Sequence, residues 1–213
     1  MTNIKKLKES IIFGLKFLKN KNLNIGSEGN ISLKTKNGFI ISPTATNPEN
    51  MAIKDISQLT LDGKRISSSR PSSEWRIHKL IYKKMKNVNA IVHCHSEWSG
   101  SLSCLRKNIP SFHYMIAEFG GKNIKCSKYA TFGTEKIAIN ILAAINNRKG
   151  CLIANHGQIV IGDNLEQALH LSEAMEKLSK QYYYCLLLGK HKLLKSCEMD
   201  EVLKLFASYK PKH

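Results

Sequence analysis

The chain has 213 residues, of which 42% are hydrophobic, and a formal net charge of +17 from 33 Lys and Arg against 16 Asp and Glu. This length suits one globular domain, the hydrophobic content argues against a disordered chain, and no apolar run is long enough to span a bilayer. The basic residues are spread along nearly every segment without a recognition motif or an aromatic-basic stripe, so we expect neither a nucleic-acid partner nor a membrane partner.

The first segment predicts an amphipathic helix rather than a targeting sequence. Hydrophobic residues recur at helical spacing over residues 3–20, with lysines between them. The first ten residues lack the apolar core and the small-residue cleavage site of a secretory signal. The six cysteines form no Cys-x-x-Cys pair, which disfavours a thiolate metal cluster and a disulfide framework. Together these features predict a cytoplasmic protein with reduced thiols.

The remaining elements are predicted from apolar periodicity and from turn residues. Strands are expected at 31–35, 38–42, 88–95, near 111–116, at 151–155 and at 159–161. A short helix and a hairpin turned at Asp62-Gly63 are expected within 50–68, and longer helices from Pro71 to about 86, at about 97–106, at 134–147, at 164–188 and at 197–208. Several strands follow each other through hairpins, so the pattern predicts a single α/β domain over residues 1–213 with a mixed, largely antiparallel sheet.

The helix that follows Pro71 begins in a polar segment. Ser72 or Ser73 is its expected N-cap, because a hydroxyl there can accept a hydrogen bond from a free backbone N–H group. Glu74 opens the helix. The expected inner stripe consists of Trp75, Leu80, Ile81 and Met85.

His93-x-His95, at the end of a buried strand, is the most informative motif of the chain. Alternate side chains of a strand share a face, so both imidazoles should point the same way and Cys94 the other way. Two adjacent buried imidazoles are hard to satisfy without a shared partner, and zinc commonly takes three protein ligands plus an open position. Glu74 and His156, where an apolar strand breaks at a glycine, are the candidates to complete a site. The other histidines are interpreted as surface or packing residues: His78, His170, His191 and His213.

Two turn-rich loops and one helix start indicate an anion site. The loops at 26–30 and 42–45 offer backbone N–H groups and small polar side chains. Ser72 and Ser73 add hydroxyls at a helix N-terminus, where the free N–H groups and the macrodipole favour a phosphate. Each feature alone is typical of a turn or a cap. Their density around one candidate metal ligand favours phosphate binding.

Seven short motifs occur in a fixed order along the chain: Gly29-Asn30-Ile-Ser, Ser42-Pro-Thr44, Pro71-Ser-Ser-Glu-Trp-Arg-Ile-His78, His93-Cys-His95, His113-Tyr-Met-Ile116, Tyr129-Ala-Thr-Phe-Gly-Thr134 and Asn155-His-Gly157. This series resembles the zinc-dependent class II aldolases of the L-fuculose-1-phosphate aldolase family, within the aldolase/adducin-head superfamily. The resemblance implies a three-layer αβα domain around a mixed, mainly antiparallel sheet. It also implies a cyclic homotetramer with one Zn²⁺ per subunit, active sites between subunits, and a C-terminal tail (about 190–213) that contributes to a neighbouring site.

The resemblance assigns roles to five residues. It implies that His93, His95 and His156 bind the zinc, and that Glu74 is the carboxylate that binds it at rest. Polarisation of a ketone by the metal makes loss of the adjacent carbon proton feasible, and a displaced Glu74 is then the general base. Tyr114 matches the tyrosine that exchanges a proton with the aldehyde oxygen.

Further positions match those that bind the rest of the substrate. The implied phosphate site consists of Gly29, Asn30, Thr44, Ala45, Ser72 and Ser73. The family usually has glycine where this chain has Ala45, and a methyl group there can narrow the pocket or disfavour positive φ. The implied aldehyde end is lined by Phe132, Phe206 and Tyr209, the last two from the tail.

The activity implied is reversible cleavage of a ketose 1-phosphate into dihydroxyacetone phosphate and a short aldehyde. L-Fuculose 1-phosphate and a 5-deoxy- or methylthio-pentulose 1-phosphate are both open as substrates. Alternatives are a methylthioribulose-1-phosphate dehydratase and a pentulose-phosphate 4-epimerase, although the epimerases carry a different segment in place of 113–116. A non-catalytic module, as adducin heads are, would lack zinc ligands, and all four candidates are present. A basic nucleic-acid binder would instead cluster its charge.

Overall fold

The computed structural model describes residues 4–189 and 191–208 and is built around a seven-stranded sheet with the order β3-β2-β1-β4-β7-β6-β5. The strands are β1 (Asn30–Thr35), β2 (Gly38–Ile41), β3 (Ser57–Leu59), β4 (Ala90–Cys94), β5 (Lys125–Cys126), β6 (Gly150–Ile153) and β7 (Gly157–Gly162). Neighbouring strands are antiparallel except β5 and β6, which are parallel. The predicted mixed, mainly antiparallel sheet is therefore confirmed.

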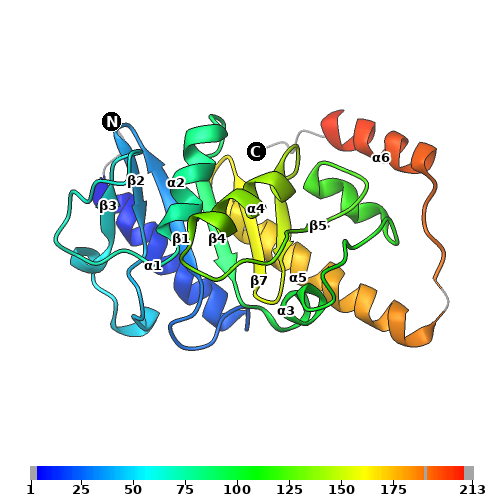
Figure 1. The fold of residues 1–213 in the computed structure, drawn as a ribbon, viewed down its shortest axis with the longest axis horizontal. Coiled ribbons are helices and arrows are strands. Elements are labelled where there is room, and N and C mark those ends of the chain that lie inside the picture. Colours follow the sequence, from blue (N-terminus) through cyan, green and yellow to red (C-terminus); the bar gives the residue numbers. More distant parts are fainter. Residues whose placement is uncertain (1–3, 190, 209–213) are drawn as a thin grey trace.

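Helices cover both faces of this sheet, which gives three layers (Figure 1). One buried cluster joins the sheet to α1 (Ile4–Asn20), α3 (Glu97–Ser103) and α5 (Leu165–Leu188). A second cluster joins the other face to α2 (Trp75–Lys84) and α4 (Glu135–Ile145). The predicted αβα arrangement is confirmed.

Strand β4 shows how the alternation of side chains positions the site. Val92 and Cys94 are buried in the cluster with α1 and α5, whereas Ile91 is buried in the cluster with α2 and α4. His93 therefore shares the face of Ile91, and Cys94 points away from it, as the two-residue period of a strand predicts. The end of β4 consequently carries an imidazole toward the N-terminus of α2.

The prediction of a strand near 111–116 is wrong. The segment forms the 3-10 helix η3 (Tyr114–Phe119), capped by His113, whose Nδ1 accepts a hydrogen bond from Met115 N at 3.2 Å. Gly120 ends it with a φ of 79°. The buried residues of this segment are Ile116, Ala117 and Phe119, which do not alternate with exposed residues as a half-buried strand requires.

Two local predictions around α2 also need correction. The helix begins after Glu74, which is its N-cap, so neither serine occupies that position; Ser72 Oγ instead accepts a hydrogen bond from Glu74 N at 3.3 Å. The buried residues of the helix are Ile77, His78, Ile81 and Tyr82. Of the predicted stripe, Ile81 is buried as expected, whereas Trp75, Leu80 and Met85 are only partly buried against the core. In place of the short helix predicted within 50–68, the chain forms the 3-10 turns η1 (Pro48–Asn50) and η2 (Ile53–Asp55), followed by strand β3. The predicted hairpin is reduced to a single bridge between Leu59 and Arg65. The other predicted helices and strands are present with bounds shifted by a few residues.

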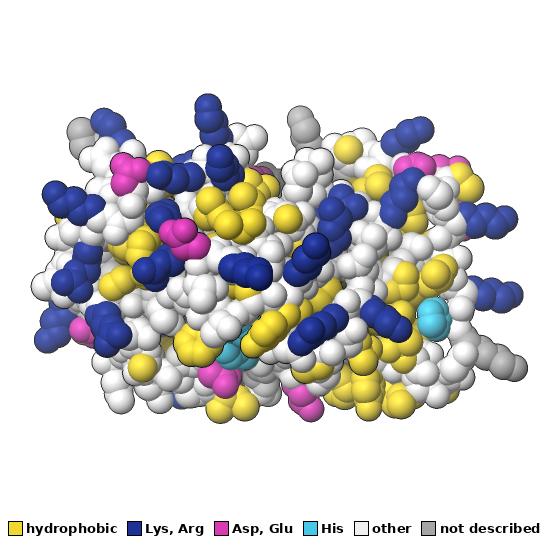
Figure 2. Space-filling model, in the orientation of Figure 1, with side chains coloured by type: hydrophobic (Ala, Val, Ile, Leu, Met, Phe, Trp, Pro, Cys, Tyr) yellow, Lys and Arg dark blue, Asp and Glu magenta, His cyan; other side chains and the backbone are white. Residues whose placement is uncertain are grey.

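After α5 the chain turns back, and α6 (Ser196–Ser208) packs against η3 (Figure 1). Met199 of α6 is buried in the larger core cluster, and Asp200 forms an ion pair with Lys122 at 2.7 Å. None of the described helices is long and apolar enough to cross a membrane. Lys and Arg side chains are dispersed over the face shown in Figure 2 rather than gathered in one patch.

Candidate metal centre

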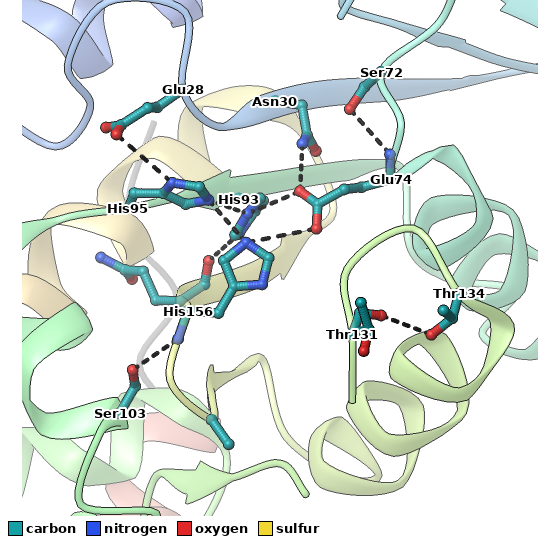
Figure 3. Close-up of polar contacts among 12 residues, drawn as sticks. Glu28, Asn30, Ser72, Glu74, His93, His95, Ser103, Thr131, Thr134 and His156 are labelled. Atoms are coloured by element: carbon teal, nitrogen blue, oxygen red, sulfur yellow. Dashed lines mark hydrogen bonds and ion pairs between the residues drawn. The ribbon is translucent and has the colours of Figure 1, made fainter. Parts of the chain in front are cut away.

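Four side chains from four places in the chain converge on one point (Figure 3). His93 lies in β4 and His95 directly after it, His156 lies in the turn between β6 and β7, and Glu74 lies at the start of α2. One ligand atom from each residue lies within 4.8 Å of those of the others. Residues separated by up to 82 positions are thus assembled because β4 and β7 are neighbours and α2 packs over the end of that pair.

The distances within this cluster are short. His95 Nε2 lies 3.0 Å from His93 Nε2 and 2.9 Å from His156 Nε2. Glu74 Oε2 lies 3.0 Å from His93 Nε2, and Glu74 Oε1 lies 3.6 Å from His156 Nε2. Three ring nitrogens and a carboxylate therefore face a common centre.

Hydrogen bonds hold the ring of His93 and the backbone of His95 and His156 in place. His93 Nδ1 donates to the backbone oxygen of Gln158 at 2.7 Å, which leaves Nε2 with a free lone pair toward the centre. Asn24 Oδ1 accepts from His95 N at 3.0 Å. Ser103 Oγ accepts from His156 N at 3.1 Å (Figure 3). The fold therefore orients the ring of His93 directly and fixes the backbone that carries the other two rings.

Burial and mutual charge set the protonation of the cluster. Burial alone raises the pKa of Glu74, but the charge and hydrogen bond of His93 and the charge of His156 outweigh it and hold that pKa well below its usual value. Burial, followed by the charge of His93, lowers the pKa of His95 and of His156 to about 4. For His93 the nearby Glu74 carboxylate outweighs burial and raises the pKa. At neutral pH the cluster thus offers a carboxylate and at least two neutral imidazoles.

The residues fit a divalent metal ion. Tetrahedral zinc with Zn–N bonds of 2.0–2.1 Å separates its nitrogen ligands by about 3.3 Å, so small ring rotations from the observed spacing suffice. Glu74 Oε1 is buried and has no hydrogen-bond partner, a costly arrangement for a carboxylate oxygen unless a cation satisfies it. Three nitrogen donors and one oxygen donor match zinc and other borderline metals better than calcium or magnesium.

A cavity of about 380 Å³ opens beside this cluster. Its walls include every residue of the predicted phosphate site: Gly29, Asn30, Thr44, Ala45, Ser72 and Ser73. Glu74, His95 and His156 line the same cavity, so the candidate metal centre and the small polar groups share one space. Among the described residues that line it, no side chain is Lys or Arg, and an anion bound there would rely on N–H and hydroxyl donors.

Three residues in the cavity wall have left-handed backbone: Gly29, Ala45 and Asn155. Gly29 has a φ of 66°, and a Cβ atom there would lie 2.5 Å from the backbone oxygen of His93, so only glycine fits against β4. Ala45, where the resemblance led us to expect glycine, has a φ of 50°. The Ala45 methyl is therefore carried on a strained backbone conformation at the wall of the cavity.

The predicted aldehyde-end residues are divided by the structure. Phe132 lines the cavity with 67% of its surface exposed. Tyr114 is 52% exposed on η3 and does not line the cavity. Phe206 of α6 is half-buried against the core and also lies outside the cavity wall. Tyr209 lies outside the described residues. Within one chain, then, Tyr114 and Phe206 are not assembled with the metal cluster.

Sequence reasoning missed several residues that shape the site. Glu28 lines the cavity, with Oε1 4.0 Å from His95 Nδ1. Asn24 and Ser103 orient ligand backbones, a role that leaves no pattern in the sequence. His78 was interpreted as a surface or packing residue, but it hydrogen-bonds Asn30. Asn30, which was predicted for the phosphate site, also donates through Nδ2 to Glu74 Oε2 at 3.0 Å. His78 follows Glu74 by four positions on α2, a helical spacing that could have revealed it.

Comparisons with known proteins agree with this geometry. The Class II Aldolase and Adducin N-terminal domain family matches residues 11–183. A 5-methylthioribulose-1-phosphate/5-deoxyribulose-1-phosphate aldolase of Rhodospirillum rubrum is 39% identical over 187 residues, 88% of this chain and 85% of that protein. An L-fuculose phosphate aldolase of Haemophilus influenzae is 39% identical over 188 residues, covering 88% and 87% of the two chains. A solved structure titled L-fuculose 1-phosphate aldolase superposes with a TM-score of 0.91 at 31% identity, covering 95% of this chain and 96% of that one.

Proposed function

The chain belongs to the class II aldolase and adducin N-terminal domain family and is an aldolase, and from this premise we propose that it reversibly cleaves a ketose 1-phosphate into dihydroxyacetone phosphate and a short aldehyde. The observation that carries the proposal is the convergence of Glu74, His93, His95 and His156 beside a cavity lined with small polar groups. Such a cavity suits a substrate that combines a carbonyl and hydroxyl end with a phosphate.

We propose that His93, His95, His156 and Glu74 hold one Zn²⁺ per subunit. A zinc ion bound there supplies Lewis-acid polarisation of the substrate carbonyl, which makes the adjacent carbon proton acidic enough to remove near neutral pH. The support for zinc is the donor set, because imidazole nitrogens with one carboxylate are its usual ligands in catalytic sites.

Glu74 is the proposed general base in the direction of synthesis. Its Oε1 atom is buried without a hydrogen-bond partner and is free to take a proton, while Oε2 is held by Asn30 at 3.0 Å. A carboxylate with a depressed pKa is ionised at neutral pH and can act as a base as soon as it is freed from a positive neighbour. In cleavage the same oxygen returns the proton to carbon.

Tyr114 is the proposed partner of the aldehyde oxygen. Its hydroxyl gives a proton to that oxygen in synthesis and takes it back in cleavage. Because Tyr114 is exposed and lies away from the cavity of its own chain, we propose that it acts in the site of a neighbouring subunit of a homotetramer. Phe206, Tyr209 and the tail at about 190–213 would cover a neighbouring site in the same way.

The phosphate group is proposed to bind at the opposite wall of the cavity. Ser72, Ser73 and Thr44 offer hydroxyls there, and Gly29 lets backbone approach closely. The relatives from Rhodospirillum rubrum and Haemophilus influenzae are named for different substrates. We therefore propose L-fuculose 1-phosphate or a 5-deoxy- or methylthio-pentulose 1-phosphate as the substrate.

A substrate panel tests the proposal. The zinc-loaded protein is incubated with L-fuculose 1-phosphate, 5-deoxyribulose 1-phosphate and 5-methylthioribulose 1-phosphate, and release of dihydroxyacetone phosphate is measured with a coupled dehydrogenase. Pentulose 5-phosphates serve as the epimerase control, and loss of water from methylthioribulose 1-phosphate without dihydroxyacetone phosphate would identify a dehydratase. We expect cleavage of at least one ketose 1-phosphate. Water loss or epimerisation in place of carbon–carbon cleavage would overturn the proposal.

A further inference from the structure

His78 is a fully buried histidine that the proposed reaction does not use. It lies in α2, one turn after Glu74, with 0% of its surface exposed. Both ring nitrogens have polar partners: Nε2 lies 2.5 Å from Asn30 Oδ1, and Nδ1 lies 2.7 Å from Ser32 Oγ. Both ring nitrogens thus have hydrogen-bond partners, and one of these partners, Asn30, contacts the candidate base Glu74. These contacts give His78 a role beyond packing.

These contacts belong to one chain of hydrogen bonds that ends at Glu74. Ser32 Oγ also lies 2.8 Å from the hydroxyl of Tyr82, and Asn30 Nδ2 lies 3.0 Å from Glu74 Oε2. The series therefore runs Tyr82, Ser32, His78, Asn30, Glu74. All five residues are buried where strand β1 and helix α2 meet.

Glu74, the last residue of the series, determines which atom donates and which accepts in each of these hydrogen bonds. A carboxylate only accepts, so Asn30 must turn its NH₂ group to Glu74 and its carbonyl oxygen to His78. That oxygen accepts, so His78 must carry its proton on Nε2, and its bare Nδ1 must accept from Ser32. Ser32 then accepts from the Tyr82 hydroxyl. One tautomer of His78 satisfies all four bonds.

We propose that His78 is a positioning residue that holds the Asn30 amide so that an N–H group, and not the carbonyl oxygen, faces Glu74 and the cavity. The inference deepens the proposed function and rests on it, because it concerns the side chain assigned there as the base. A flipped Asn30 amide would place an acceptor against the carboxylate, which would repel Glu74 from its position beside the histidine cluster.

The consequence of this arrangement is that the two oxygens of Glu74 are not equivalent. Oε2 is tied to Asn30, whereas Oε1 is the buried oxygen without a hydrogen-bond partner. His78 thereby keeps one oxygen anchored and the other available. Burial, with a smaller effect from the charge of His93, also lowers the pKa of His78 to about 3, so its Nδ1 stays free to accept throughout the physiological range.

Substitutions at His78 separate positioning from packing. His78→Gln keeps an N–H donor close to the location of Nε2, whereas His78→Phe keeps the bulk and removes the donor. We expect kcat for ketose 1-phosphate cleavage to fall about 10–100-fold in the Phe variant, the range typical of groups that orient metal-site residues. The Gln variant should recover most of that loss. Zinc content should stay full in both, because neither change touches the three ring nitrogens of the cluster.

Tyr82→Phe is the matched control. It removes a hydroxyl from the same buried series but leaves the bond from His78 to Asn30 intact. Its loss of kcat should be clearly smaller than that of His78→Phe. If Tyr82→Phe and His78→Gln both lose as much as His78→Phe, the effect is one of core packing and the proposal is wrong.

A second readout needs neither substrate nor turnover. Long-range ¹H–¹⁵N correlation spectra of the zinc-loaded wild-type protein report which ring nitrogen of His78 carries the proton. We expect the Nε2–H tautomer, with a slowly exchanging Asn30 side-chain amide. The Nδ1–H tautomer would overturn the proposal even if every substitution lowered activity. Failure of the wild-type protein to cleave any ketose 1-phosphate would overturn the proposed function instead and leave this spectrum as the test of the hydrogen-bond series.

Discussion

The metal cluster and the η3–α6 region differ in how complete they are within one chain. Glu74 and His93 are buried, and their partners in the cluster lie within hydrogen-bond distance. By contrast, Tyr114 on η3 is 52% exposed, and neither it nor Phe206 of α6 reaches the cavity. The first region has its polar groups converging on a point, whereas the second presents Tyr114 to the surface and packs Phe206 partly against the core.

This difference shows which functional groups a single chain can bring together by itself. Ligands must be rigid, and the cluster is built at the end of two central strands, where the backbone is fixed by the sheet. Tyr114 is exposed, and the proposal that it transfers a proton requires a neighbouring subunit to complete the surface around it. The two regions should therefore respond differently to substitution.

The largest expected effect follows from breaking the cluster. His95→Ala removes the ligand that contacts both other rings, at 3.0 and 2.9 Å. We expect zinc affinity to fall more than about 100-fold, beyond the upper end of losses for outer partners of a metal site, and ketose 1-phosphate cleavage to be lost. Elemental analysis after dialysis measures zinc, and circular dichroism checks the fold.

The matched control for this experiment is His170→Ala. His170 is an exposed histidine on α5 that pairs with Glu118 at 2.7 Å, away from the cluster. It should keep zinc and activity. Full zinc content and unchanged cleavage in His95→Ala would contradict the assigned ligand set.

The next largest effects come from one substitution in each of the two regions. Tyr114→Phe should retain zinc and lower kcat by about 10²- to 10⁴-fold, the range for loss of a general acid or base. Glu74→Gln should be inactive by itself, because an amide cannot take the proton. Each variant then lacks a group from a different region.

Mixing these two variants tests whether the regions meet between subunits. If Tyr114 serves a neighbouring site, co-refolded assemblies of the two variants contain some sites with both groups intact, roughly a quarter at random mixing. Recovery of activity in the mixture is the expected outcome. Continued inactivity, with mixed assemblies demonstrated by mass spectrometry, would mean that both groups act within one chain.

The sequence predicted the cluster better than it predicted its surroundings. Alternation along β4 places His93 and His95 on one face from residue spacing alone, and an apolar strand broken by glycine marked His156. The η3 segment was misread because apolar residues of a short helix resemble a strand when only a few are considered. Asn24 acts through a contact across the fold, and no local pattern encodes such a contact. Asn30 was predicted for the phosphate site, but its hydrogen bond to Glu74 was not predicted.

A smaller effect concerns the stability of the metal-free protein in acid. Burial, with a smaller effect from the charge of His93, lowers the pKa of His78 to about 3, whereas an unfolded histidine titrates near 6.5. Between these values the unfolded state binds a proton that the folded state does not, so the free energy of unfolding decreases as pH falls below about 6.5. The slope from this one group approaches about 1.4 kcal/mol per pH unit.

Urea unfolding at pH 7, 6 and 5 measures that slope. His78→Gln lacks the titrating group, so its free energy of unfolding should depend on pH less steeply than that of the wild-type protein. The two slopes should differ by up to about 1.4 kcal/mol per pH unit, the effect of one proton. Equal slopes for the two proteins would contradict a buried neutral His78.

The smallest predicted effect lies at Ala45, which lines the cavity beside the cluster. Its φ of 50° costs about 1–2 kcal/mol for a residue with a Cβ atom. Ala45→Gly removes that strain but gives the unfolded chain more freedom, which offsets about 0.4–1 kcal/mol. We therefore expect a net gain in unfolding free energy of only about 0.5 kcal/mol, measured by thermal denaturation. Because the substitution removes a methyl group from the cavity wall, KM should stay equal or decrease. A clear loss of stability would mean that the methyl group makes contacts that outweigh the backbone strain.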